Sequence, residues 1–119
     1  MATVDNTTFT YFFQNFIAYP TFDNYTDVVF TVNWKYTAVY IDPTSQKEYK
    51  NETMRMTPVS TNNITNFVPF DQLTQQECIG WVSAVENIPQ MQQEMVSAIN
   101  NQINPPPPSI VVLPPPFSQ

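Results

Sequence analysis

The stretch "DVVFTVNWKYTAVYI", Asp27 to Ile41, decides the fold because its side chains alternate in character along its length. Every second residue is apolar, and these residues form one set: Val28, Phe30, Val32, Trp34, Tyr36, Ala38 and Tyr40. The residues between them are mostly polar. Since successive side chains of a β-strand point to opposite faces, the pattern predicts a long strand with one buried face and one mostly solvated face.

The segments on both sides of this strand predict partners for it in an antiparallel sheet. After it, "DPTSQ" from Asp42 carries the proline and small polar residues of a turn, and a weaker alternation predicts a return strand over residues 47–57, ended by Pro58. Residues 59–66, "VSTNNITN", are typical of a loop. Before the long strand, "FTYFFQNFIAYPTF" fits both a strand period and a helical period, and its β-propensity favours a strand over residues 9–19.

Two helices are predicted in the C-terminal half. In the first, Thr74 followed by Glu77 forms a capping box, in which each residue satisfies a backbone N–H of the other. Cys78, Val82 and Val85 then share one face of this helix. This face is expected to pack on the sheet.

The second helix begins at Asn87, a residue suited to a helix cap, and has Pro89 in its first turn, where a missing N–H costs nothing. Its apolar residues are spaced three or four apart: Ile88, Met91, Met95, Ile99 and Ile103. Pro105 ends it. A short break at residues 86–88 separates the two helices, so we expect an αα-hairpin over the sheet.

These elements predict an α+β fold, with a small antiparallel sheet of two to four strands packed against a C-terminal αα-hairpin and followed by an extended polyproline-rich tail. The expected organisation is a mobile or extended N-terminal arm over residues 1–8, a single α+β domain over residues 9–104 and an extended C-terminal arm over residues 105–119. A chain of 119 residues buries one modest core, which agrees with a single domain.

Charge excludes several classes of partner. The chain has four basic and ten acidic residues, a formal net charge of −6, and its basic residues are dispersed. Nucleic acids and anionic membranes both require local positive charge, so we expect no direct contact with either. No segment has the length of a transmembrane helix, and the N-terminus lacks the basic start of a signal peptide, so neither is expected.

Residues that carry chemistry are scarce. Without histidine the usual general base and the commonest metal ligand are missing, and a single cysteine cannot build a zinc site or an intrachain disulfide. Paired carboxylates, Glu48 with Glu52 or Asp23 with Asp27, are the remaining catalytic option, and solvated face residues explain them better. We therefore expect no enzyme, and no catalytic, cofactor-binding or metal-binding residue.

Several other residues have a structural interpretation that we prefer to a functional one. Cys78 is expected to be a small core residue, and Gly80 to permit close approach of another element to its helix. The methionines at 54, 56, 91 and 95 are expected in the core rather than in a binding groove, and the tryptophans at 34 and 81 as core anchors.

The C-terminal segment "NPPPPSIVVLPPPFSQ" carries the strongest functional signal. Its two proline runs favour polyproline II, which spans on the order of 45 Å over residues 105–119 at about 3.1 Å per residue. Such a stiff segment loses little entropy when it docks. We predict that it docks on a partner through six residues: Ile110, Val111, Val112, Leu113, Pro114 and Phe117. The middle four residues, 110–113, also suit docking as a short strand added to a neighbour's sheet edge. The alternatives to docking are a disordered tail and a ligand for an SH3-like domain, which the lack of flanking basic residues disfavours.

Two motifs resemble a family of uncharacterised small proteins from tailed bacteriophages, associated chiefly with phages of aquatic bacteria such as cyanobacteria. The family pattern F-[IV]-P-[YF]-x-x-L-T is matched by "FVPFDQLT" at residues 67–74, and its I-G-W-V helix by residues 79–82. The preceding strand with a central Trp, the second helix and the proline-containing tail also match, whereas the first 25 residues or so depart from the pattern. The resemblance implies a virion protein and supplies no functional residues.

Together, the low charge, the arm and the resemblance predict a non-enzymatic virion structural protein. The first hypothesis is a capsid decoration or cement protein, present in many copies or as a homo-oligomer, with its arm lying on the major capsid protein or another neighbouring subunit. Tail or neck accessory proteins are the alternative within the virion. A different class of function is an adaptor that binds a host protein through the proline-rich tail.

Overall fold

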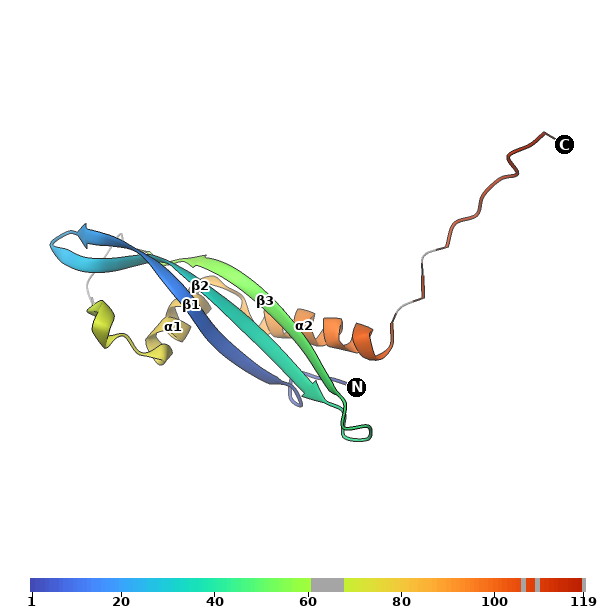
Figure 1. Ribbon diagram of the computed structural model, residues 1–119, viewed down its shortest axis with the longest axis horizontal. Helices are drawn as coiled ribbons and strands as arrows, with labels where there is room; N and C mark the ends of the chain where they lie inside the picture. The colour runs from blue at the N-terminus through green and yellow to red at the C-terminus, as the bar shows by residue number, and fades with distance from the viewer. Residues whose placement is uncertain (61–67, 106, 109, 119) are drawn as a thin grey trace.

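The computed structural model describes residues 1–60, 68–105, 107–108 and 110–118. Its elements are β1 (Thr8–Phe22), β2 (Tyr25–Ile41), β3 (Glu48–Pro58), a short 3-10 helix η1 (Phe70–Gln72), α1 (Gln75–Val85) and α2 (Ile88–Ile103). Three antiparallel strands thus precede two helices, which confirms the α+β class (Figure 1). Most of the loop predicted over residues 59–66 lies outside the described residues, as does Phe67.

β2 is the central strand and pairs antiparallel with both neighbours, in the order β1-β2-β3. The alternation in its sequence is confirmed, because Val32, Trp34 and Ala38 are fully buried on the helix side of the sheet, while Lys35 and Thr37 between them stay partly exposed. The remaining members of the predicted apolar set are buried as well, except Phe30, which is half-buried.

The two strand connections are tight turns built by polar residues. Asp23 and Asn24 join β1 to β2 with φ angles of 48° and 68°, the left-handed conformation that two-residue hairpin loops require. After β2, the Asp42 carboxylate accepts hydrogen bonds from the backbone N–H groups of Thr44 at 2.8 Å and Ser45 at 3.1 Å. These two bonds hold the pKa of Asp42 below its ordinary value, with that from Ser45 the larger cause. The predicted turn at Asp42 is confirmed.

β1 is a strand with two irregularities in its pairing. Phe13 lies opposite Trp34 and Asn15 opposite Asn33, so Gln14 is an extra residue on β1. Further along the pair, Ile17 and Ala18 lie opposite Thr31 and Val29, so the extra residue there is on β2. A bulge moves the following side chains to the other face, and this explains why the aromatic spacing of this segment fits no single period.

The caps of both helices form as the sequence predicts. The Thr74 hydroxyl accepts from the Glu77 N–H at 3.2 Å, and the Asn87 side chain accepts from the Gln90 N–H at 3.2 Å. The Glu77 carboxylate accepts from the Thr74 hydroxyl at 3.1 Å. In the predicted capping box it would instead accept from the backbone N–H of Thr74.

The predicted helix faces are buried or, at Ile88 and Ile103, partly buried against the core, with one exception. Cys78 and Val82 of α1 are buried, as are Met91, Met95 and Ile99 of α2, and all but Cys78 belong to one core cluster with β2. Val85 was expected on the same face and is 53% exposed. It is the last residue of α1, where the chain leaves the sheet to begin α2.

The two helices follow one another along the helix side of the sheet (Figure 1). They therefore do not lie side by side. The αα-hairpin expected from the sequence would have placed them side by side. Only Glu86 and Asn87 lie between them. A strand of 17 residues such as β2 is about 56 Å long at roughly 3.3 Å per residue, whereas 11 and 16 helical residues span only about 16 and 24 Å. Arranged in succession, the short helices cover more of this long sheet than a hairpin would.

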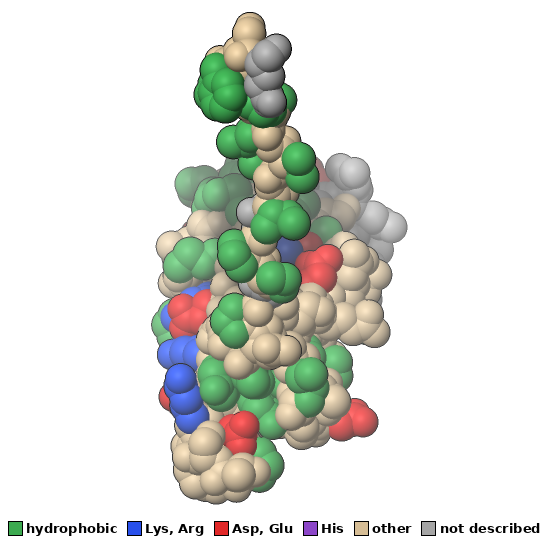
Figure 2. Space-filling model, turned by 90° about the vertical axis from the view of Figure 1, so that its right-hand side faces the viewer, with side chains coloured by type: hydrophobic (Ala, Val, Ile, Leu, Met, Phe, Trp, Pro, Cys, Tyr) green, Lys and Arg blue, Asp and Glu red, His purple; other side chains and the backbone are tan. Residues whose placement is uncertain are grey.

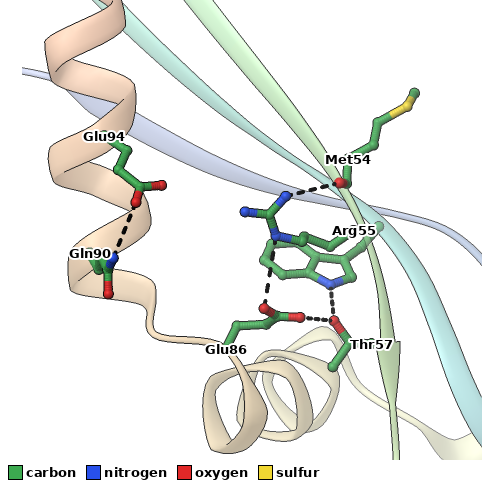
Figure 3. Close-up of polar contacts among 7 residues, drawn as sticks. Met54, Arg55, Thr57, Glu86, Gln90 and Glu94 are labelled. Carbon is green, nitrogen blue, oxygen red and sulfur yellow. Dashed lines mark hydrogen bonds and ion pairs between the residues drawn. The ribbon is translucent and has the colours of Figure 1, made fainter.

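The junction between the helices is fixed to the sheet by a buried polar chain. The Trp34 indole N–H donates to the Thr57 hydroxyl at 2.8 Å, and this hydroxyl donates to the Glu86 carboxylate at 2.7 Å (Figure 3). Arg55 forms an ion pair with the same carboxylate, with 3.8 Å between Nε and Oε1. Thr57 is fully buried, so its bond with Trp34 is shielded from water, whereas its bond with Glu86 is only partly buried.

Side chains of α2 also bond to the sheet along its length. Gln92 donates to the Tyr36 hydroxyl at 2.9 Å, and Gln102 donates to the Lys50 carbonyl at 2.9 Å. Burial raises the pKa of Tyr36 to about 12, an effect that the Gln92 bond partly opposes. The phenol is therefore protonated at neutral pH.

The N-terminal residues lie against α2 instead of extending as the arm predicted over residues 1–8. Ala2 is only 2% exposed, and its N–H donates to the Asn100 side chain at 2.9 Å. The Asn100 amide in turn donates to the Ala2 carbonyl at 3.0 Å. The Asn100 side chain thus both accepts from and donates to the backbone of Ala2. A sequence pattern does not reveal such a contact.

Replacing Thr57 by Val should destabilise the protein by about 1–3 kcal/mol, because the buried Trp34 N–H and the Glu86 carboxylate would both lose a partner while the side-chain volume stays the same. Urea unfolding of the purified variant measures this. Thr37→Val, on the other face of β2, is the matched control and should stay within about 0.5 kcal/mol of the parent. Equal effects for the two variants would contradict the role of the polar chain.

Replacing Gly80 by Ala should stabilise the protein by roughly 0.5–1 kcal/mol, because Ala restricts the unfolded chain and favours the helix. A Cβ atom at this position would meet no other atom within 4 Å, so the close approach expected from the sequence is absent here. Thermal unfolding tests this. A lower melting temperature for Gly80→Ala would show that another element does need the space.

Candidate functional site

The predicted docking residues lie on the segment that leaves α2 and runs away from the body (Figure 1). Ile110, Val111, Val112 and Leu113 are 88%, 76%, 95% and 78% exposed, and Phe117 is 66% exposed. Pro114 is exposed as well. None of these residues belongs to a helix or strand. The structure therefore presents the whole predicted set to solvent, and we call residues 105–118 the arm.

The arm is apolar and carries no charge. Figure 2 shows hydrophobic side chains, prolines included, along its length. No Asp, Glu, Lys or Arg occurs between Asn104 and Gln119. Single exposed apolar residues are common on proteins, but a contiguous set of this kind marks an interaction surface. Docking would remove this apolar area from water without desolvating any charged side chain.

A second apolar surface is β1 itself, the aromatic-rich segment that departs from the family pattern and that the sequence marked as a candidate second arm. Seven aromatic residues lie on it: Phe9, Tyr11, Phe12, Phe13, Phe16, Tyr19 and Phe22. None of the strand's 15 residues is buried, and Phe12 is 56% exposed. β1 is thus the most aromatic strand of the sheet and has no buried residue, whereas β2 holds seven buried hydrophobic residues.

The position of the helices explains why β1 is only partly covered. The buried residues that α1 and α2 contribute pack with those of β2, and the junction at Glu86 is bonded to Thr57 of β3. On β1, Tyr11 packs against Tyr36 with ring centroids 4.6 Å apart, and Phe9 stacks on the same ring at 5.6 Å. Each aromatic ring of β1 therefore has a neighbour in the sheet but keeps part of its surface open to solvent.

A hollow of about 550 Å³ lies where β1 approaches the start of α1. Its β1 side is formed by Tyr11, Phe13 and Phe16, and its opposite side by Phe70 and Leu73. Phe70 meets Phe16 edge-on, with ring centroids 5.6 Å apart. None of the described residues that line the hollow carries a charge. A concave aromatic surface of this kind suits an apolar or proline-rich ligand.

The outer face of the sheet, opposite the helices, contains two methionines that were expected in the core. Met54 and Met56 are 66% and 68% exposed, because β3 places them beside Lys35 and Asn33 on the outer face of β2. Met91 and Met95 are in the core as expected. The spacing of Met54 and Met56 was correct for a strand, but the sequence did not reveal which face of β3 the helices cover.

The two candidate carboxylate pairs are not assembled into a site. Glu52 lies 3.7 Å from the Lys35 ammonium and 3.4 Å from that of Lys50, whereas Asp23 is in the β1–β2 turn. All four carboxylates, those of Asp23, Asp27, Glu48 and Glu52, are exposed. Among the described residues no group of three or more Asp, Glu, Cys or His side chains could hold a metal ion, and no helix is long and apolar enough to cross a membrane.

Cys78 is a buried residue on the sheet-facing side of α1, 4% exposed. Burial raises the pKa of its thiol, and the neighbouring Glu77 carboxylate adds to the effect. Both causes disfavour the thiolate, which is the reactive form. The residue therefore has the environment of a small core side chain, as predicted.

The tryptophans differ in burial. Trp34 is fully buried, as expected of a core anchor, and Trp81 is partly buried and packs against the core.

A family model described as "Domain of unknown function (DUF7936)" matches residues 6–115. The chain belongs to this family. The match runs from the residues before β1 through α2 and the arm, and includes five of the six predicted docking residues: Ile110, Val111, Val112, Leu113 and Pro114. No curated protein and no solved structure matches the chain.

Cys78 should react slowly with a thiol reagent such as iodoacetamide at pH 8 in the native protein, because its thiol is buried and its pKa is raised. Labelling in urea, where the chain is unfolded, should be faster by at least tenfold, as about 1.4 kcal/mol of native-state protection implies. Mass spectrometry follows both reactions. Native labelling at the unfolded rate would mean that the thiol is accessible and that its environment is not that of a core residue.

Proposed function

We propose that this member of the DUF7936 family is a non-enzymatic structural protein of a phage virion. It acts as a capsid decoration or cement protein that attaches to neighbouring subunits through its C-terminal arm. The observation that carries the proposal is the exposure of Ile110–Leu113, between 76% and 95%, on a segment directed away from the folded body. The body supplies a rigid base, and the arm supplies the contact.

The energetics favour docking of the arm. Burying a large apolar side chain stabilises a complex by roughly 1.5–3 kcal/mol, and the arm offers five of them: Ile110, Val111, Val112, Leu113 and Phe117. The prolines on both sides have already restricted the backbone, so less conformational entropy is lost on docking. Three such side chains are enough to hold an arm that is tethered to its own domain.

The virion setting is supported by the phage-protein resemblance of two motifs. Their described residues build the body: Leu73 and Thr74 lead into α1, and residues 79–82 form its middle. Val82 is fully buried and Trp81 packs on the core. These motifs thus preserve the domain that holds the arm and contribute no chemistry.

Replacing Val112 by Asp in the full-length chain should reduce the number of copies bound to purified particles by about tenfold or more. The variant loses at least about 1.5 kcal/mol of apolar burial and places a charge in the contact. Quantitative mass spectrometry of particles measures the copy number. Because Val112 is 95% exposed, the fold should be unaffected, which circular dichroism verifies.

Ser83→Asp is the matched control, since it adds the same charge at an exposed position of α1, outside the arm, and should leave incorporation unchanged. Many copies per particle support a decoration protein, whereas a small number indicates the tail or neck. Absence of the parent protein from particles, or full incorporation of Val112→Asp, would contradict the proposal.

A further inference from the structure

The free edge of β1 is a second place where this protein lacks a partner. Within the described part of the chain, β1 pairs only with β2, so the backbone N–H and C=O groups on its other side are open. The stretch from Thr8 to Phe13 is regular and pairs residue for residue with Val39 to Trp34. An exposed regular edge is a template for an additional strand.

The two edges of the sheet differ in how they are protected. β3, at one edge, carries four charged residues, Glu48, Lys50, Glu52 and Arg55, and ends at Pro58. β1, at the other edge, carries no charged residue from Thr8 to Phe22. Charges on an edge strand prevent pairing with another chain, because pairing would desolvate them. β1 carries no such charges. The bulge at Gln14 and Pro20 also hinder edge pairing, but both lie beyond the regular stretch Thr8–Phe13.

The arm contains a segment with the properties of the missing strand. Ile110, Val111 and Val112 are β-branched and Leu113 is apolar, so they favour extended structure on a partly buried surface. All four have backbone N–H groups, as does Ser109 before them, whereas the prolines beyond these five residues have none. Pairing is thereby restricted to these few residues, a length that fits within the regular edge of β1.

We propose that Ile110–Leu113 of one copy adds as a fourth strand to the free edge of β1, along Thr8–Phe13, in a second copy of this chain. This inference rests on the docking role of the arm and names its partner. Both surfaces are uncharged in a chain whose net charge is −6, so they associate without placing like charges together. Backbone hydrogen bonds provide the pairing, and the aromatic side chains of β1 provide the apolar cover.

The length of the arm also matches the hollow beside β1. If the added strand runs parallel to β1, the residues from Pro114 to Phe117 extend about 12 Å beyond it at roughly 3.1 Å per residue. The distance along β1 from Phe13 to Phe16, which line the hollow, is about 10 Å at roughly 3.3 Å per residue. In this orientation Phe117 reaches the hollow. Pro114 to Pro116, which cannot donate backbone hydrogen bonds to a neighbouring strand, then lie beside the bulge at Gln14.

An arm that docks on the edge of another copy forms a head-to-tail interface, in which each copy gives one arm and receives another. Such an interface generates a closed ring or an open chain of subunits. It also predicts complementation between two defective copies. A copy with a damaged arm still offers a good edge, and a copy with a damaged edge still offers a good arm, so together they make one interface and stop at a dimer.

The test uses two full-length variants. Val112→Asp damages the arm, and Phe12→Glu damages the edge, where the new carboxylate lies near Lys35, whose ammonium is 5.4 Å from the Phe12 ring. Sedimentation velocity should show the parent protein forming larger species as concentration rises and each variant alone remaining a monomer. An equimolar mixture of the two variants should form a one-to-one dimer. Met56→Glu, which adds the same charge on β3, should associate like the parent.

Proline substitutions distinguish strand addition from unspecific apolar contact. In a strand, neighbouring residues direct their N–H groups to opposite sides, so only one of Val111 and Val112 donates to β1. Val111→Pro and Val112→Pro should therefore differ, with one variant losing association by at least about tenfold and the other close to the parent. Equal effects of the two prolines would overturn the strand, and a mixture that stays monomeric would overturn the edge of β1 as its site.

Failure of this inference is separable from failure of the docking role. A parent protein that remains monomeric at all concentrations, yet is incorporated into particles in an arm-dependent manner, would exclude a second copy as the partner and leave the proposed function intact. Loss of arm dependence in the particles would instead contradict the proposed function itself.

Discussion

The structure depends on how two short helices cover a long sheet. Val82, Met91, Met95 and Ile99 pack on β2, and Glu86 is held to β3 through Thr57, so the helix layer is centred on two of the three strands. The aromatic strand β1 is covered less completely, because five of its residues pack against this core but none is buried. The same domain that buries a stable core therefore leaves an apolar edge exposed, and directs a second apolar segment away from the end of α2.

Much of the fold was predictable because local patterns agreed with tertiary structure. The alternation through β2, the caps at Thr74 and Asn87 and the turn at Asp42 each depend on neighbouring residues alone. Other features depend on contacts that a pattern does not contain. The period of β1 is broken by the bulge at Gln14, the exposure of Met54 follows from which face of the sheet the helices occupy, and the N-terminal residues are held by Asn100.

The candidate site divides in the same way. The arm was identified from the sequence, because a run of aliphatic residues between prolines cannot be part of a helix or sheet within the domain. The edge of β1 was missed, because being at an edge is a property of strand order. One sequence signal was present nonetheless: residues 6–22 contain no charged side chain, in contrast to residues 47–55 of the opposite edge strand. In the proposed pairing, the arm of one copy and the β1 edge of another cover each other, which would explain why both are exposed in a single copy.

Amide hydrogen exchange of the full-length protein, measured over a range of concentrations, tests this account most directly. It reports backbone protection at Thr8–Phe13 and at Ile110–Leu113 in the same sample. If these segments form one interface between copies, protection of both should rise together and with the same midpoint as concentration increases. Exchange that stays fast and independent of concentration in either segment would contradict the pairing of the arm with β1.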